Sequence, residues 1–479
     1  MSTTKRVIIA VVVLLVLSIA GILTREGYLL ATAAPNITVD YAEQINTRVR
    51  ETNQSLALPK GDYAAFEHLL RTIAEPDRQR ARAAFPTDNS PQVQYAALYN
   101  PGESDEQQTL AQQAMADHVA SGRIDTLEQL PGLVGAFRKI PGNSQMLSVL
   151  LPELSDARHV ARLLNARFVL AAREGRQADA AIELQRIVSL GSILTRQATL
   201  IDRLVGVAIH SLAIDSIRDL HASGHMPGSL AAKLLPIAQQ IGTRPTYAPQ
   251  LESERACMLD VIQRTHTKQG RFIPSEFDRI LGGTGFRAPL QLPVFMPRKA
   301  ETEALANNFY DLAINISQQP SPARDYSQLD AATAIKSANP VFSAMIPALS
   351  KALTSEDQLL TTLHGVQTLL ALEIHRDRTG AYPRTLNELV PSVFPQLPPD
   401  VIAKDGTFRY TPRPEGVTSG RPFLLYSIGR DQIDNQGTEH PTLDVTALTL
   451  SSLNAGIDYV VNRKSPSNIP ADSSAPRAQ

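Results

Sequence analysis

The stretch FVLAAREGRQADAAIELQRIVSLGSI, Phe168–Ile193, decides the fold class, because it reads as two helices joined by a tight turn at Gly175. Ser155 and Asp156 are good N-caps for the first helix, and a third helix ends near Gly224. Apolar residues recur at helical spacing in all three: Val160, Leu164, Phe168, Ala171; Ala180, Leu184, Ile187, Val188, Gly191, Leu194; and Ile201, Leu204, Val205, Ala208, Leu212. The pattern predicts a helical body.

Other parts of the chain fit the same body. Further helices are predicted at 62–74, 105–121, 230–240, 251–267, 300–316 and 355–379, and loops at 85–103 and 272–297. The hairpin at 168–193 resembles a tetratricopeptide-type helical pair, but no second copy follows at the period of about 34 residues. We therefore expect a single hairpin in a bundle or an irregular solenoid, which is either plain architecture or one wall of a peptide-binding groove.

Before the body lies one unbroken apolar run, VIIAVVVLLVLSIAGIL, at 7–23, directly behind Lys5 and Arg6. Seventeen such residues match the thickness of a bilayer core, and the basic pair favours a cytoplasmic N-terminus. We expect a single-pass anchor in the cell membrane, with the bulk of the chain extracytoplasmic. The alternative is a cleaved signal peptide, since Ala31-Thr32-Ala33 has the small-x-small form that a signal peptidase accepts.

Composition excludes several classes of function. Lys plus Arg number 46 against 47 for Asp plus Glu, so no net positive charge is available to attract nucleic acid. The single cysteine, Cys257, cannot form an intrachain disulfide. The absence of Trp and the few aromatics are typical of a helix-rich protein. The expected partners are the membrane, through the N-terminal helix, and a protein that the sequence does not name.

From Leu369 onward the sequence pattern changes from long helices to a helix end followed by turn and strand signals. Gly380 ends a long helix, Tyr382-Pro383 turns the chain, and Thr385 caps a short helix at 386–390. Two strands follow, at 407–411 and 422–428, and they are predicted to pair across the intervening loop. Phe408, Tyr410, Phe423 and Leu425 are the expected strand residues, with at least one aromatic packed on the long helix.

This order resembles the C-terminal globular domain of the major pseudopilin of type II secretion systems. The matching elements are Gly380-Ala381-Tyr382-Pro383, Leu397-Pro398-Pro399-Asp400, the stretch from Gly406 to Tyr410, and the stretch from Phe423 to Asp431. The whole chain also resembles uncharacterised, N-terminally anchored bacterial helical proteins. The anchor lacks the Gly-Phe and the Glu of a pseudopilin, and more than three hundred residues separate it from the head, so pilus assembly is not expected.

The fold class is thus mainly α: a transmembrane helix, an extracytoplasmic helical bundle or irregular solenoid, and a small C-terminal α+β pseudopilin-like head. The predicted limits are 1–30 for the cytoplasmic tip and anchor, 31–150 for a stalk and short helices, 151–354 for the helical body, 355–464 for the head and 465–479 for a disordered tail. Separate cores are expected for body and head.

The resemblance also implies a calcium site, because pseudopilins bind calcium in the loop after the matching strand. Asp431, Asp434 and Asn435 stand where that loop would be, Glu439 and Asp444 lie nearby, and Asp458 matches a later Asp of the family. Carboxylate oxygens suit calcium, which takes six to eight oxygen ligands. Gln432 departs from the family, which has Gly there. The competing interpretation is an ordinary solvated acidic turn.

No set of residues in the sequence indicates a particular enzymatic reaction. His221 and His225 are four apart, but Gly224 lies between them and the zinc-protease pattern is absent, so we interpret them as surface or C-terminal helix histidines. The sequence contains no nucleophile elbow, dinucleotide fingerprint or paired-cysteine motif. We therefore expect a non-enzymatic scaffold or protein-interaction protein, accessory to an export or surface-assembly system. The alternative is a hydrolase with a site assembled in the helical body.

Overall fold

The computed structural model describes residues 33–58, 61–100, 102–148, 151–241, 247–281, 297–334, 339–346, 349–412, 421–438 and 458–462, with a few isolated residues before them. This part of the chain is mainly helical, with one small antiparallel sheet near its C-terminal end. None of its helices is both long and apolar enough to cross a membrane. The predicted anchor at 7–23 lies almost entirely outside the described residues, as does the tail from 465.

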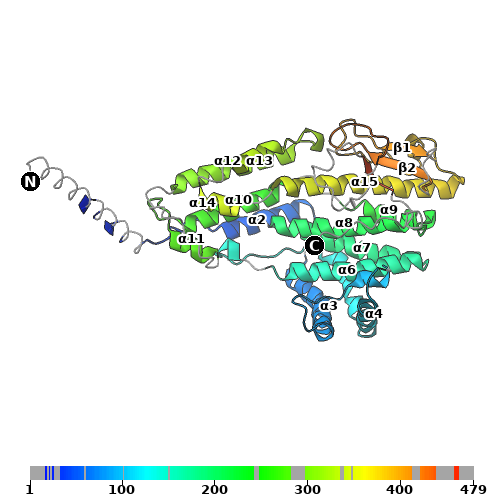
Figure 1. The fold of residues 1–479 in the computed structure, drawn as a ribbon, viewed down its shortest axis with the longest axis horizontal. Helices are drawn as coiled ribbons and strands as arrows, with labels where there is room; N and C mark the ends of the chain where they lie inside the picture. Colours follow the sequence, from blue (N-terminus) through cyan, green and yellow to red (C-terminus); the bar gives the residue numbers. More distant parts are fainter. Residues whose placement is uncertain are drawn as a thin grey trace, which may run out of the picture.

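The centre of the molecule is a stack of long helices (Figure 1). Helix α6 packs on α7, α7 on α8, and α8 on α15. Helix α9 packs against both α7 and α15. Their bounds are α6 Glu153–Arg173, α7 Gln177–Thr195, α8 Leu200–Ala222, α9 Gly228–Ala238 and α15 Leu349–Thr379. The predicted helical body is confirmed, with Gly175 at positive φ in the turn between the first two helices.

Helices α7 and α8 approach closely because glycines lie at their crossing. A Cβ on Gly191 would come within 2.4 Å of the His210 ring, and one on Gly206 within 2.6 Å of the Gly191 carbonyl oxygen. Only a residue without a side chain allows this contact. The crossing therefore depends on both glycines.

Two further groups of helices flank the stack. On the α6 side lie α3 Tyr63–Ala84, η1 Tyr95–Leu98, α4 Asp105–Ala120, α5 Arg123–Thr126 and η2 Leu127–Leu133. Helix α3 was predicted to end at 74, but it runs to Ala84 and continues through Pro76. Asp77 and Ala81 beyond it are buried, and this packing outweighs the lost backbone hydrogen bond.

The second group surrounds α10 Ala248–Arg264 and forms a separate apolar cluster with the first turns of α15. Its members are α11 Pro274–Ile280, α12 Lys299–Gln318, η5 Ser321–Ala323, α13 Ser327–Ala334 and α14 Pro340–Met345. Helix α2, Tyr41–Ser55, packs on α10 through a third, small cluster that also contains Met146 of η3, Met146–Ser148.

The C-terminal head follows the predicted order. Gly380 has positive φ after α15, Thr385 caps η7 Leu386–Leu389, and β1 Arg409–Pro412 pairs with β2 Phe423–Ser427 in antiparallel fashion. A third strand, β3 Tyr459–Val460, pairs with the other edge of β2 and was not predicted. Phe423 and Leu425 face α15, whereas Leu424 and Tyr426 belong to a cluster on the opposite face of the sheet.

The expectation of separate cores is wrong. Leu363, Leu369 and Leu370 of α15 lie in one apolar cluster with residues of α6 to α9 and with Phe408, Phe423 and Leu425 of the head. Helix α15 begins at Leu349, within the second group of helices, and ends under the sheet, so it belongs to both parts. The predicted boundary at 354 falls inside this helix.

Candidate functional site

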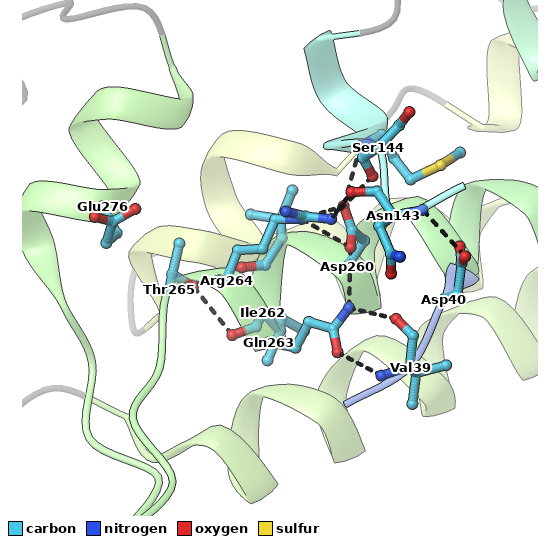
Figure 2. A network of polar contacts seen from close by, with 12 residues as sticks. Val39, Asp40, Asn143, Ser144, Asp260, Ile262, Gln263, Arg264, Thr265 and Glu276 are labelled. Carbon is cyan, nitrogen blue, oxygen red and sulfur yellow. Dashed lines mark hydrogen bonds and ion pairs between the residues drawn. The ribbon is translucent and has the colours of Figure 1, made fainter. Parts of the chain in front are cut away.

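The segment 33–40, which we call the exit segment, leads from the predicted anchor into the body and is held by its backbone (Figure 2). The Gln263 side chain of α10 accepts hydrogen bonds at Oε1 from the N–H groups of Thr38 (3.0 Å) and Val39 (3.2 Å), and its Nε2 donates to the Val39 carbonyl (2.8 Å). The Asn36 N–H donates to the His266 carbonyl (3.1 Å). One amide side chain thus pairs with an extended segment much as a neighbouring strand would.

A second set of contacts fixes the end of this segment. Asp40 caps α2 by accepting from the Glu43 N–H (3.1 Å), and it also accepts from the Asn143 N–H (3.0 Å). Arg264 donates to the carbonyls of Asn143 (2.9 Å) and Ser144 (3.0 Å) and is paired with Asp260 (2.8 Å). The end of α10 therefore holds both the exit segment and the loop beside it.

At the other end of the body, buried charges hold the head. Arg218 of α8 is fully buried; its Nε donates to the Val461 carbonyl (2.7 Å) and its Nη2 to the Val460 carbonyl (3.0 Å). Asp215 balances its charge at 3.0 Å. A body helix therefore supplies hydrogen bonds that β3 would otherwise obtain from another strand.

Two further carboxylates join head and body. Asp357 of α15 is buried and accepts from Arg324 (2.6 Å), from Tyr326 Oη (2.7 Å) and from Arg430 of the loop after β2. Arg430 also donates to the Ser321 carbonyl (3.1 Å). These contacts tie the loop that precedes the acidic turn to η5 and α13.

The second carboxylate is Glu373, near the end of α15. It accepts from Tyr382 Oη (2.7 Å) and contacts His221 Nε2 (3.0 Å) and Arg376 (2.6 Å). His221 lies in the last turn of α8, as expected, but it is largely buried and not a surface residue. Burial beside Glu373 raises the pKa of Tyr382 above its usual value.

Three of the predicted calcium ligands, Asp431, Asp434 and Asn435, form hydrogen bonds in and beside the turn after β2. Asp434 Oδ1 accepts from Tyr426 Oη (2.9 Å) and its Oδ2 lies 3.6 Å from Arg409 Nε, while Asp431 accepts from the Ile433 N–H (3.1 Å). The Asn435 amide donates to the Ile433 carbonyl (3.2 Å). These groups are engaged in ordering the turn.

Asp458 differs from the other three. Its Oδ2 accepts from the Gly437 N–H (2.7 Å), while its buried Oδ1 has no hydrogen-bond partner among the described residues. Burial raises the pKa of Asp458, backbone hydrogen bonds from Gly437 and Asn435 oppose this rise, and the negative charge of Asp434 adds to it. Within the described ranges no group of three or more His, Cys, Asp or Glu could hold a metal ion, and Glu439 and Asp444 lie outside those ranges.

Gln432, in the turn after β2, has a φ of +62°. This is the left-handed region that favours Gly. Its Nε2 donates to the carbonyls of Gly429 (2.7 Å) and Ile402 (3.0 Å), and these bonds hold the strained backbone in place.

A buried polar cluster on the α6 side joins three helices. Asp77 of α3 accepts from Tyr95 Oη (2.6 Å) and contacts Nε2 of His118 of α4 (3.0 Å) and of His159 of α6 (2.7 Å). Although burial alone would raise it, these hydrogen bonds hold the pKa of Asp77 well below its usual value. The carboxylate is thus kept ionised by its donors.

No protein-family model, curated protein or solved structure matches this chain. The site must therefore be interpreted from its own geometry. The buried carboxylates Asp77, Asp357 and Glu373 each bridge different elements and are each surrounded by donors.

Sequence reasoning missed these bridges. Asp77 lies 41 residues from His118 and 82 from His159, and Arg218 lies 242 residues from Val460. The one available signal was a polar or charged residue on an otherwise apolar helix face, as at Arg218. Such a residue indicates a buried partner but does not say which one.

Proposed function

We propose that this protein is a membrane-anchored extracytoplasmic scaffold that holds its C-terminal head at a fixed place relative to the anchor. The observation that carries the proposal is the position of the two attachments. The exit segment joins the body at the end of α10 and at His266 just beyond it, toward one end of the longest axis, and the sheet lies toward the other end (Figure 1). A chain of packed helices connects them.

The fixed geometry favours a scaffold over the hydrolase considered from the sequence. An enzyme needs acid and base groups that are free to act on a substrate. Here Asp77, Asp357 and Glu373 hold helices together through side chains of other elements. In a scaffold these buried carboxylates would fix one arrangement of the body helices and the head.

The finer likeness to a pseudopilin head is part of this proposal. It is supported by the order of a long helix, a corner at Gly380, a short capped helix and an antiparallel pair of strands. We infer that the head is the surface presented to a protein partner, as an accessory to an export or surface-assembly system. Fold alone does not carry an activity from one protein to another.

Two measurements test the scaffold. A reporter fused after Leu30 should be active only in an exported compartment; a mature protein that begins at Ala34 and washes off membranes would contradict the anchor. Spin labels at the exposed positions Ile37 and Asn387 should give one narrow distance distribution in the full chain. A broad distribution would mean that head and exit segment move independently, and the scaffold would be wrong.

Calcium binding in the head is a separate proposal. Its support is the buried Oδ1 of Asp458, which has no hydrogen-bond partner among the described residues, and the nearness of Asp458 to Asp434 and Asn435. Calcium bound only by the folded state at a hundredfold excess over Kd would stabilise it by about 2.7 kcal/mol. The full chain should then melt higher in calcium than in chelator, Asp458→Asn should abolish the difference, and magnesium should substitute poorly. Identical melting curves would leave an ordinary acidic turn.

A further inference from the structure

A hollow of about 280 Å³ lies in the head, where β1, η7 and α15 meet. Phe408 and Tyr410 line it from the side of β1, Leu386 and Asn387 from η7, and Thr368 from α15. Its lining, as far as the structure describes it, contains no Asp or Glu. The hollow is therefore separate from the buried carboxylates that hold the head on the body.

Strand β1 forms one edge of the sheet beside this hollow. The strand order is β1-β2-β3, so no strand of the described chain pairs with the outer side of β1. The direction of its peptide groups follows from β2. Leu425 accepts from the Val461 N–H (2.8 Å) and donates to Asn462 Oδ1 (3.0 Å), so its N–H and C=O both point toward β3. Tyr410 lies opposite Leu425, and the N–H and C=O of Tyr410 therefore point outward, away from β2.

The carbonyl of Pro412 points in the same direction. Pro412 lies opposite Phe423, whose carbonyl accepts from Asn462 Nδ2 (2.6 Å) on the β3 side. The outer edge of β1 thus presents one N–H and two carbonyl groups along an extended backbone. A further extended chain can satisfy such a row of peptide groups, because it carries donors and acceptors at the same spacing.

A chain added at this edge would place side chains in the hollow. Residues directly opposite each other in a sheet share one face, and Leu425, opposite Tyr410, faces α15. An added residue opposite Tyr410 would face α15 too, on the side where the hollow lies. Leu386, Leu397 and Phe408 give the hollow an apolar lining. An apolar side chain therefore fits this position.

Arg384 supplies the one charge among the described lining residues. It is exposed and forms no ion pair with any residue that the structure describes. The neighbouring Glu388 accepts instead from the backbone N–H groups of Arg384 (2.9 Å) and Thr385 (3.0 Å) at the start of η7. The guanidinium of Arg384 is thus available to a carboxylate from outside the head.

We propose that the outer edge of β1 and the adjoining hollow, which we call the edge site, bind an extended acidic segment of a partner protein. The segment adds to the sheet as an antiparallel strand, places an apolar side chain in the hollow and pairs a carboxylate on the same face, two residues away, with Arg384. This inference rests on the proposed role of the head as the surface presented to a protein partner, and it states how that partner is recognised.

The test selects random octapeptides, displayed on phage, for binding to the full chain in a neutral detergent. Asn387→Trp, which fills the hollow from an exposed position, serves for counter-selection, and its melting curve should match that of the wild type. The selected peptides should carry an apolar and an acidic residue two positions apart. The proposal is overturned if no peptide prefers the wild type over Asn387→Trp, or if the preferred peptides lack this pattern.

The affinity of the best selected peptide, measured by fluorescence polarisation, separates the parts of the site. Methylation of the peptide nitrogen at its apolar residue removes the donor to the Tyr410 carbonyl and should weaken binding at least tenfold. Arg384→Gln should weaken binding up to about fivefold and abolish the preference for Asp over Asn in the peptide. Lys404→Gln, an exposed cation of the head outside the hollow, should bind as the wild type does. Unchanged affinity on methylation or in Arg384→Gln would also overturn the proposal.

These results are independent of the tests of the scaffold. Absence of peptide binding together with one narrow distance between labels at Ile37 and Asn387 would overturn the edge site and leave the scaffold in place. Peptide binding together with a broad distance distribution would overturn the scaffold and leave the edge site in place.

Discussion

The exit segment is attached through its backbone, whereas the head is attached through side chains. At the first attachment Gln263 pairs with the peptide groups of Thr38 and Val39, and the apolar support is the small cluster around α2. At the second, Arg218 and Asp357 are buried beside a core that the head shares with α6 to α9. Backbone pairing tolerates many sequences and can open locally, whereas a shared core makes the head part of the cooperative unit.

The largest expected effect follows from the shared core. Ending the chain after residue 348 removes α15 and uncovers the apolar faces of α8 and α9, which pack against it. Each large apolar residue left in water costs about 2 kcal/mol, so we expect the body to lose cooperative folding. Circular dichroism during heating measures this. A chain that begins at residue 33 is the control, and it should melt cooperatively; an unchanged melt in the shortened body would mean that the core is not shared.

Arg218→Met tests the second attachment without shortening the chain. The methionine fills similar space but leaves the carbonyls of Val460 and Val461 without their donor and removes the ion pair with Asp215. We expect a loss of about 4 kcal/mol in the free energy of unfolding, measured by denaturant titration. Arg176→Met, which breaks only surface pairs, should change it by less than about 0.5 kcal/mol. Equal effects in the two variants would show that β3 contributes nothing to head attachment.

Asp77 belongs to neither attachment and gives a pH-dependent reference for both. Its pKa is lower in the folded than in the unfolded state, so its stabilising contribution is present above the unfolded value of about 3.9 and is lost as the pH falls through the folded value. Asp77→Asn should cost about 3 kcal/mol at neutral pH and should flatten the fall in stability below about pH 4. Denaturant titration at several pH values measures both, with Asp117→Asn, an exposed carboxylate, as control. If the free energy of unfolding of Asp77→Asn fell with decreasing pH as steeply as that of the wild type, groups other than Asp77 would cause the acid sensitivity.

The smallest effect is expected at the exit segment. Gln263→Ala removes three hydrogen bonds to Thr38 and Val39 but leaves α2 and its cluster in place. We expect a loss of about 1 kcal/mol, seen as faster hydrogen exchange at 36–40 with little change in Tm. Gln108→Ala, on the exposed face of α4, should leave that exchange unchanged. If Gln263→Ala lowered the Tm by as much as Arg218→Met does, the two attachments would contribute equally to stability, contrary to this prediction.

The sequence predicted the long helices of the body and the turns that join them because their signals are local, but it missed the helix α11 inside the predicted loop at 272–297. The apolar spacing in α6 to α8 and the turn residues Gly175 and Gly380 act within a few positions. Strand β3 was missed because it has two residues and depends on Arg218, far away in the chain. The calcium prediction came from the resemblance to a pseudopilin loop, which could not indicate that Asp434 lies within reach of Arg409 or that Asp431 caps its own turn. Only the tertiary fold decides such pairings.

The contact between Arg218 and β3 also has a consequence for the order in which the chain is made. Helix α8 is synthesised more than two hundred residues before Val460 and Val461. The Arg218 guanidinium therefore has no access to these two acceptors until late in translation. A product cut short before residue 458 would keep the guanidinium of Arg218 without the carbonyls of Val460 and Val461. Such a product would unfold more often and be removed by proteases more readily than the finished protein. Because of Arg218, resistance of the protein to proteolysis in the cell depends on synthesis of the complete chain.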